Sequence, residues 1–166
     1  MNRTRTMAAF AALGATLLLA AVAIPSFAVT PILVEPVTPR SEVTDRVAAQ
    51  LRVKREGGET TTINMADLSK VVVAKITVQP GASFPWHTHA GPVLVIVAQG
   101  ALVYISSEDC QERTYASGES FVDAGHGHVH SAVNRTAGET ILYATFLQAP
   151  ASGPLTITEG VTPPDC

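Results

Sequence analysis

The chain has 166 residues, a formal net charge of −3 and a charged fraction of only 15%. Globular domains carry about 25% charged residues on average, so this composition favours a compact domain with much buried surface and argues against disorder. Lys and Arg form no basic patch or arm after the first five residues, and we therefore expect no nucleic-acid partner.

The N-terminus has the pattern of a secretory signal peptide. A short basic segment precedes an almost uncharged stretch at residues 7–24, and Ser26 and Ala28 then provide the small residues of a cleavage site. We predict that residues 1–28 are removed and that the mature protein is secreted, or resides in the periplasm or cell envelope, without a membrane partner. An uncleaved membrane anchor is the less favoured alternative, because the apolar stretch is weakly hydrophobic and near the shortest length that spans a bilayer.

Residues 29–45 are predicted to form a Pro-rich N-terminal arm. Three prolines in this segment exclude a helix and favour an extended linker or an edge strand. We assign residues 46–150 to one β domain and residues 151–166 to a C-terminal tail, a size that suits a single domain.

The β domain is predicted from short β-branched stretches that end at Gly, Pro, Asn or Asp. Residues 50–56 alternate polar and apolar side chains, and the break at Gly57 and Gly58 before residues 60–63 predicts a hairpin. Residues 47–51 fit either one helical turn or the start of a strand. Further strands are predicted at residues 71–78, 101–105, 111–115, 120–122, 130–133, 140–147 and 155–158. Many short strands with glycine turns predict an all-β sandwich or closed barrel.

Residues 93–98 form a continuous apolar run, bounded by Pro92 and Gly100. A short β-branched run without alternation is typical of a strand that is covered on both faces. The N-terminal arm or a second subunit would supply the cover, so a homodimer is a further expectation.

All five histidines lie in two short windows, residues 87–89 and 126–130. Two residues apart on an extended backbone, His87 and His89 point to the same face, and His130 is the natural third donor around one cation. Imidazole ligands suit a divalent transition metal (Fe, Zn, Cu, Ni or Mn) better than Ca or Mg. The alternative is a set of hydrogen-bonded histidines without a metal.

Other side chains near these windows have several interpretations. For His128 there are three interpretations: a fourth metal ligand, a residue at the rim of the site, or a hydrogen-bond partner behind the ligands, which we favour. His126 is predicted to be a loop residue. Asp123 either orients a histidine or lies on the surface. The apolar residues predicted to line a small pocket are Phe84, Trp86, Val93, Val95 and Phe121, together with Tyr143 or Phe146 according to the face.

Cys110 and Cys166 are the two cysteines of the chain. In an exported protein, such a pair is expected to form a disulfide, which here would tie the last residue to the polar turn at residues 106–112. Two unrelated thiols are the alternative.

The spacing of these residues resembles the two conserved motifs of the cupins. The first motif is matched by Gly81, His87, His89 and Gly100, and the second by Gly118, Gly125, Gly127, His130 and Asn134. The resemblance spans about residues 70–148 and implies one small β-barrel of two packed antiparallel sheets with a metal site in its mouth. Barrels of this type often pair as dimers.

Val93 stands where the cupin motif has a glutamate, and no carboxylate lies between His89 and Asp109. The resemblance therefore implies three neutral histidine ligands and no charged one, as in the three-His iron sites of the thiol dioxygenase branch of cupins. The proline of the second motif is replaced by Ala124 or Gly125, which predicts a looser turn.

Three functions are consistent with this sequence. The first is a metal-dependent enzyme of the oxygenase type that acts on a small molecule. The second is non-catalytic binding of a small ligand or a metal, and the third is a structural or interaction barrel without metal. Because no general acid or base other than the histidines is apparent, the sequence leaves the choice between enzyme and binder open.

Overall fold

The computed structural model describes residues 31–166, and the predicted signal peptide at residues 1–28 lies outside the described residues. The described part of the chain contains eleven strands joined by turns and loops, and it contains no helix, which confirms the all-β prediction. Between residues 31 and 166 there is accordingly no helix with the length and apolarity needed to cross a membrane.

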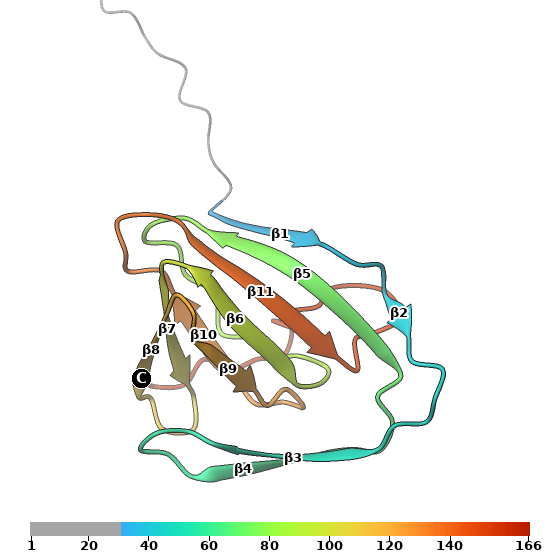
Figure 1. Ribbon diagram of the computed structural model, residues 1–166. Helices are drawn as coiled ribbons and strands as arrows, with labels where there is room; N and C mark the ends of the chain where they lie inside the picture. The colour runs from blue at the N-terminus through green and yellow to red at the C-terminus, as the bar shows by residue number, and fades with distance from the viewer. Residues whose placement is uncertain (1–30) are drawn as a thin grey trace, which may run out of the picture.

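The larger sheet forms one wall of the barrel and is antiparallel (Figure 1). Its strands, in spatial order, are β1 (Ile32–Pro36), β5 (Lys70–Val78), β11 (Thr140–Leu147), β6 (Val93–Gln99) and β9 (Ser120–Asp123), and the short β2 (Ser41–Glu42) also pairs with β5. Strands β1 and β2 come from the Pro-rich arm, which therefore joins the sheet at its edge. Proline is tolerated there because one side of an edge strand has no ladder partner.

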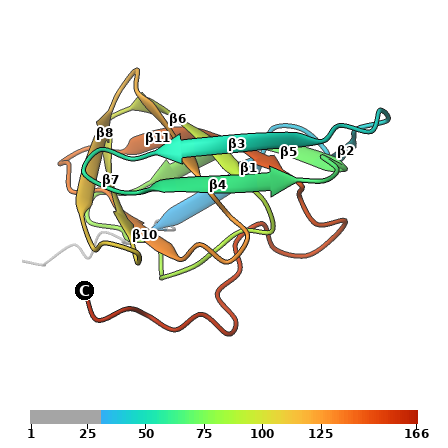
Figure 2. The same ribbon diagram turned by 90° about the horizontal axis from the view of Figure 1, so that it is seen from below.

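A smaller antiparallel sheet forms the opposite wall. It contains β10 (His130–Val133), β7 (Ala101–Ser106) and β8 (Glu112–Ala116), in that order. A separate hairpin of β3 (Ala49–Lys54) and β4 (Thr60–Met65) runs along one end of the barrel, at the bottom of Figure 1 and in front of the sheets in Figure 2. The strand that begins at Ala49 excludes the helical turn considered for residues 47–51.

The hydrophobic core lies between the two sheets and follows the two-residue period of the strands. On β5, the side chains of Val72, Ala74, Ile76 and Val78 all point inward, as their alternation predicts. The inner faces of β6 and β11 continue this core with Val93, Val95, Val97, Leu142, Ala144 and Phe146. Because full burial of one Val or Leu side chain contributes about 1.5–3 kcal/mol, these strands give the barrel a stable framework.

The N-terminal arm does not cover the second face of residues 93–98, and cover by a second subunit stays a prediction. The inner face of β6 is buried, but Leu94 and Ile96 on the opposite face are 39% and 46% exposed. None of the residues from 31 onward covers this face, because the N-terminal arm pairs with β5 at the edge of the sheet and does not cross over β6.

The strand predicted at residues 155–158 is also absent from the described structure. This part of the C-terminal tail makes one isolated bridge, in which the backbones of Thr88 and Ile157 exchange hydrogen bonds of 3.0 and 2.9 Å. Thr88 belongs to the irregular segment between β5 and β6, which offers the tail no longer strand to pair with.

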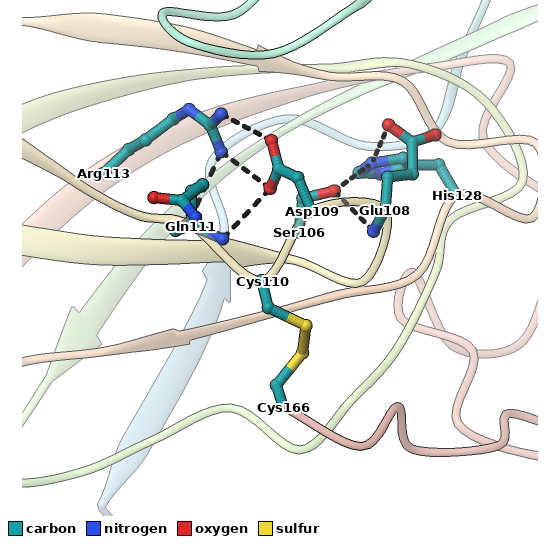
Figure 3. The surroundings of a disulfide bond; sticks show 8 residues. All are labelled: Ser106, Glu108, Asp109, Cys110, Gln111, Arg113, His128 and Cys166. Atoms are coloured by element: carbon teal, nitrogen blue, oxygen red, sulfur yellow. Dashed lines mark hydrogen bonds and ion pairs between the residues drawn. A yellow bond between two sulfur atoms is a disulfide. The ribbon is translucent and has the colours of Figure 1, made fainter.

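A disulfide joins Cys110 to Cys166, as the sequence predicts, with the two Cα atoms 5.5 Å apart (Figure 3). Cys110 lies in the turn between β7 and β8, so the bond ties the last residue of the chain to the smaller sheet. An ion pair of 2.6 Å between Arg113 and Asp109 braces the same turn.

Candidate metal centre

Three buried histidines, His87, His89 and His130, come together at one side of the barrel interior and are called the three-histidine cluster. His87 and His89 lie in the segment between β5 and β6, and His130 begins β10. The backbones of His87 and His130 exchange two hydrogen bonds of 2.9 Å, which brings the two ring centroids to 4.1 Å. One ring nitrogen from each histidine lies within 4.8 Å of the others. The structure thus brings together the three residues predicted as ligands.

The hydrogen bonds of the rings show which nitrogen each histidine can offer. His87 Nδ1 lies 2.7 Å from the carbonyl oxygen of Pro85, and His89 Nδ1 lies 2.8 Å from that of Leu155. Because a carbonyl oxygen only accepts hydrogen bonds, both Nδ1 atoms carry the proton and both Nε2 atoms keep a free lone pair. A neutral ring with a free Nε2 is a form in which histidine binds metal ions.

Burial keeps the three rings uncharged. Desolvation, together with the neighbouring His89, lowers the pKa of His87 from 6.5 to about 4. Burial also lowers the pKa of His89, and it places the pKa of His130 well below the usual value despite the opposing influence of Asp123. The rings are therefore neutral at pH 7, which is the protonation state that metal binding requires.

Asp123 at the end of β9 supplies a buried carboxylate directly behind His130. Its Oδ2 atom lies 3.1 Å from His130 Nδ1, although this contact lacks the alignment of a hydrogen bond. The same oxygen accepts a hydrogen bond of 2.7 Å from the hydroxyl of Tyr104 and lies 2.9 Å from Nδ1 of His128. Burial opposes ionisation, but the hydrogen bond with His128 and the nearby His130 outweigh it and lower the pKa of Asp123. A carboxylate in this position orients the ring of a metal-binding histidine.

His128 lies buried behind this carboxylate and not at an exposed rim. Its Nδ1 bonds to Asp123, and its Nε2 lies 3.0 Å from Ser106 Oγ and 3.5 Å from the carboxylate of Glu108. Both ring nitrogens are thus engaged outside the three-histidine cluster. His126, in contrast, is exposed in the loop.

The loop before β10 packs closely on the first histidine window. Gly125 has a φ of 60°, and a Cβ atom there would lie 2.0 Å from the carbonyl oxygen of Gly91. The next residue, His126, donates its N–H to the carbonyl oxygen of His89 at 3.0 Å. Glycine at position 125 therefore permits a close approach, where the sequence predicts a looser turn.

An apolar cavity of about 60 Å³ adjoins the three-histidine cluster. Four of the five predicted pocket residues line it: Phe84, Val93, Val95 and Phe121. Trp86 does not line it. Of the two aromatic residues on β11, Phe146 faces the cavity, whereas Tyr143 lies on the outer face of the larger sheet and is 40% exposed.

Several residues that line the cavity were not predicted as pocket residues from the sequence. Leu102 and Tyr104 come from β7, and Leu155 and Thr156 come from the C-terminal tail. Leu155 contributes to the site in two ways: its side chain lines the cavity, and its carbonyl oxygen accepts a hydrogen bond from Nδ1 of His89. The tail lacks a hydrophobic period, so its sequence does not predict which residues face inward.

The donor set fits a divalent transition metal ion. Neutral imidazoles suit Zn, Cu, Fe and Ni, and a site without a coordinating carboxylate disfavours Ca and Mg. Three protein ligands also leave at least one coordination position for a small molecule, as in catalytic metal sites.

Comparison with protein families matches residues 74–146 to the cupin domain. Comparison with curated proteins gives no match. Among solved structures, the chain is similar to the cupin domain of an XRE-family transcriptional regulator from Enterobacter cloacae, with 19% identity and a TM-score of 0.48 over 73% of this chain and 99% of that chain. It is also similar to the polyketide cyclase RemF from Streptomyces resistomycificus, with 18% identity and a TM-score of 0.45 over 55% of this chain and 62% of that chain. A third similar structure is KdgF from Halomonas sp., with 20% identity and a TM-score of 0.41 over 49% of this chain and 71% of that chain.

The family match includes all three residues of the three-histidine cluster and most of the larger sheet. The two antiparallel sheets around this cluster also agree with the barrel that the sequence motifs imply. The chain therefore contains a cupin domain, at residues 74–146.

Proposed function

We propose that this protein is exported, that its three-histidine cluster binds one divalent transition metal ion, and that a small molecule binds beside this ion in the cavity. The main observation behind the proposal is that the Nδ1 atoms of His87 and His89 both donate hydrogen bonds to backbone carbonyl oxygens. Together with the carboxylate of Asp123 beside Nδ1 of His130, this leaves three neutral rings with Nε2 available for one ion.

The cavity favours a small, mostly apolar ligand with one anionic donor atom. Its walls are mainly Val, Leu, Ala and Phe side chains, and no Lys or Arg occurs among the described residues that line it. A divalent ion held by three neutral histidines beside one carboxylate, Asp123, leaves one positive charge without a partner in a poorly solvated site. A thiolate, carboxylate or phenolate group on the ligand would compensate this charge.

Ligand binding is better supported than acid–base catalysis. Apart from the three-histidine cluster, the titratable residues that line the cavity are Tyr104 and Asp123. Burial and the neighbouring Asp123 raise the pKa of Tyr104, and hydrogen bonds engage the carboxylate of Asp123. Neither group is therefore poised to exchange a proton with a ligand at neutral pH.

An oxygenase-type enzyme is the second candidate function. The free coordination position of a three-histidine site favours it, because a bound metal ion supplies Lewis acidity or, in the case of iron, a centre for oxygen chemistry. In this case the residues of the chain would bind and orient the substrate, and the apolar walls would exclude water from it.

Elemental analysis of protein purified from its native compartment tests the metal-binding proposal. We expect about one equivalent of Fe, Zn, Cu, Ni or Mn in the wild type and loss of this metal in the His87→Ala and His130→Ala variants. His126→Ala is the matched control, because His126 is an exposed histidine outside the cluster and its loss should leave the metal content unchanged. A metal-free wild type, with unchanged stability of the His87→Ala variant, would contradict the proposal.

Two further measurements address catalysis and export. Oxygen uptake by the metal-loaded protein with a panel of small thiols, carboxylic acids and phenols separates an oxygenase from a binder, because a binder consumes no oxygen. Mass spectrometry of the N-terminus tests export, and we expect the mature chain to begin at Val29 in the envelope or the medium. An intact N-terminus on cytoplasmic protein would contradict the export proposal.

A further inference from the structure

The C-terminal strap, defined as residues 154–166, lies outside the cupin domain and still contacts the candidate metal centre. Leu155 and Thr156 line the cavity, and Leu155 also packs against the hydrophobic core. The carbonyl oxygen of Leu155 accepts the Nδ1 hydrogen of His89 at 2.8 Å. One wall of the cavity and the group that determines the tautomer of His89 therefore both come from the strap.

The strap is attached to the barrel at one short stretch. The N–H of Thr88 donates to the carbonyl oxygen of Ile157 at 3.0 Å, and the N–H of Ile157 donates to Thr88 at 2.9 Å. Thr88 is the residue between His87 and His89, so this bridge places the strap directly beside the three-histidine cluster. These two hydrogen bonds and the one to His89 hold the strap against the site.

Beyond Ile157, the covalent bond is the anchor of the strap. In the described part of the chain, no hydrogen bond joins residues 158–166 to the barrel. The disulfide between Cys166 and Cys110 attaches this stretch to the turn between β7 and β8, as Figure 3 shows. Both cysteines are exposed, so a reductant in solution can reach the bond.

A segment with so few hydrogen bonds opens locally at low cost when nothing else restrains it. A covalent tie at the far end removes most conformations of the released segment, and it therefore favours the closed state. When the strap opens, His89 loses the acceptor that keeps the proton on Nδ1, and the cavity loses the wall formed by Leu155 and Thr156.

We propose that the disulfide-held strap retains the metal ion, because it keeps the carbonyl oxygen of Leu155 on His89 and closes the cavity. Cleavage of the Cys110–Cys166 bond then lets the strap open and the ion leave. The inference rests on the proposed metal-binding function. A dithiol such as dithiothreitol cleaves the bond by exchange: the two cysteine sulfurs take up two electrons and two protons and become thiols, and the reagent is oxidised to its cyclic disulfide.

Two measurements on the mature chain test the proposal, with wild type compared to the Cys110→Ser/Cys166→Ser double variant. The first is nuclear magnetic resonance of the histidine ring nitrogens in the metal-free protein. We expect a protected Nδ1 proton on His89 in the wild type and faster exchange of this proton with water in the variant. The second is the release of zinc from the loaded protein into an excess of chelator, which should be about 10- to 100-fold faster in the variant.

Asp109→Asn is the matched control. It removes the ion pair with Arg113 in the same turn but leaves the disulfide in place, so the zinc release rate and the exchange at His89 should match the wild type. Circular dichroism verifies the fold of each variant. If the double variant does not fold, wild type reduced with dithiothreitol gives the same comparison, and reoxidation should restore slow release.

Unchanged exchange of the His89 Nδ1 proton in the disulfide-free protein would overturn the proposal. An unchanged rate of zinc release, despite faster exchange, would overturn it as well. A wild type that binds none of Fe, Zn, Cu, Ni and Mn would instead refute metal binding by the three-histidine cluster, and the exchange at His89 would still decide whether the strap positions this ring.

Discussion

Val93 of β6 and Asp123 of β9 are paired directly across the larger sheet, and both side chains are buried against the cavity, at 2% and 1% exposure. Side chains of directly paired residues lie on the same face of a sheet. The cupin motif has a glutamate at the position of Val93, so the facing strand provides the carboxylate that this position lacks. The carboxylate of Asp123 lies 3.1 Å from Nδ1 of His130, which is a member of the three-histidine cluster.

Replacement of Asp123 by Asn should weaken metal binding by about 10- to 100-fold, since a carboxylate behind a ligating histidine raises its basicity and holds its ring. Competition with a chromophoric chelator measures the affinity. Adding Val93→Glu to this variant should restore part of the affinity, because the side chain at position 93 faces the same cavity. Glu59→Gln, which removes an exposed acid from the β3–β4 hairpin, is the control. Wild-type affinity in Asp123→Asn would contradict the role of the carboxylate.

The metal-free protein should lose stability when the pH falls from about 6.5 to about 4. Burial lowers the pKa of His87 to about 4, whereas in the unfolded chain it stays near 6.5. Between these two pH values the unfolded chain binds a proton that the folded protein does not. The free energy of unfolding is therefore highest above pH 6.5 and decreases as the pH falls towards 4. The loss is on the order of 3 kcal/mol for this residue. Urea unfolding at both ends of this pH range measures it, and His87→Gln should lose less. Equal losses in the two proteins would show that another group is responsible.

Gly125→Ala should destabilise the protein more than Gly127→Ala. Both glycines have positive φ, at 60° and 85°, so alanine costs about 1–2 kcal/mol at either position. At position 125, the new Cβ atom would also lie 2.0 Å from the carbonyl oxygen of Gly91, whereas nothing lies within 4 Å of a Cβ atom at position 127. Thermal unfolding compares the two variants, and equal midpoints would contradict the close packing of this loop.

Asn134→Ala should lower the free energy of unfolding by on the order of 3 kcal/mol, because it leaves buried backbone groups without partners. The side chain of Asn134 is fully buried and donates to the carbonyl oxygens of Val78 and Gly138 at 2.9 and 2.8 Å. It also accepts a hydrogen bond from the N–H of Thr136 at 2.9 Å. Urea denaturation gives the value, and Asn64→Ala at an exposed position serves as the control. A loss no larger than that of the control would show that these bonds contribute little.

The sequence by itself determined the elements that depend on neighbours along the chain. The alternation on β5 and the Gly and Pro residues between strands predicted an all-β barrel, because a strand presents every second side chain to one face. His87 and His89 face the same way for the same reason, and the second window added His130 as their partner. The pairing of Cys110 with Cys166 also followed from composition, since the chain has only two cysteines.

Only the tertiary structure decided what surrounds the three-histidine cluster. The carbonyl oxygen that holds His89 comes from Leu155, 66 positions later, in a tail whose sequence has no period. Trp86 is adjacent to His87 but does not line the cavity, because the chain bends at Trp86 and the alternation expected of an extended backbone does not continue from Phe84. The apolar residues Leu94 and Ile96 remain exposed because the arm joins the edge of the sheet. Such outcomes depend on how distant segments pack together, and a local pattern carries no information about that choice.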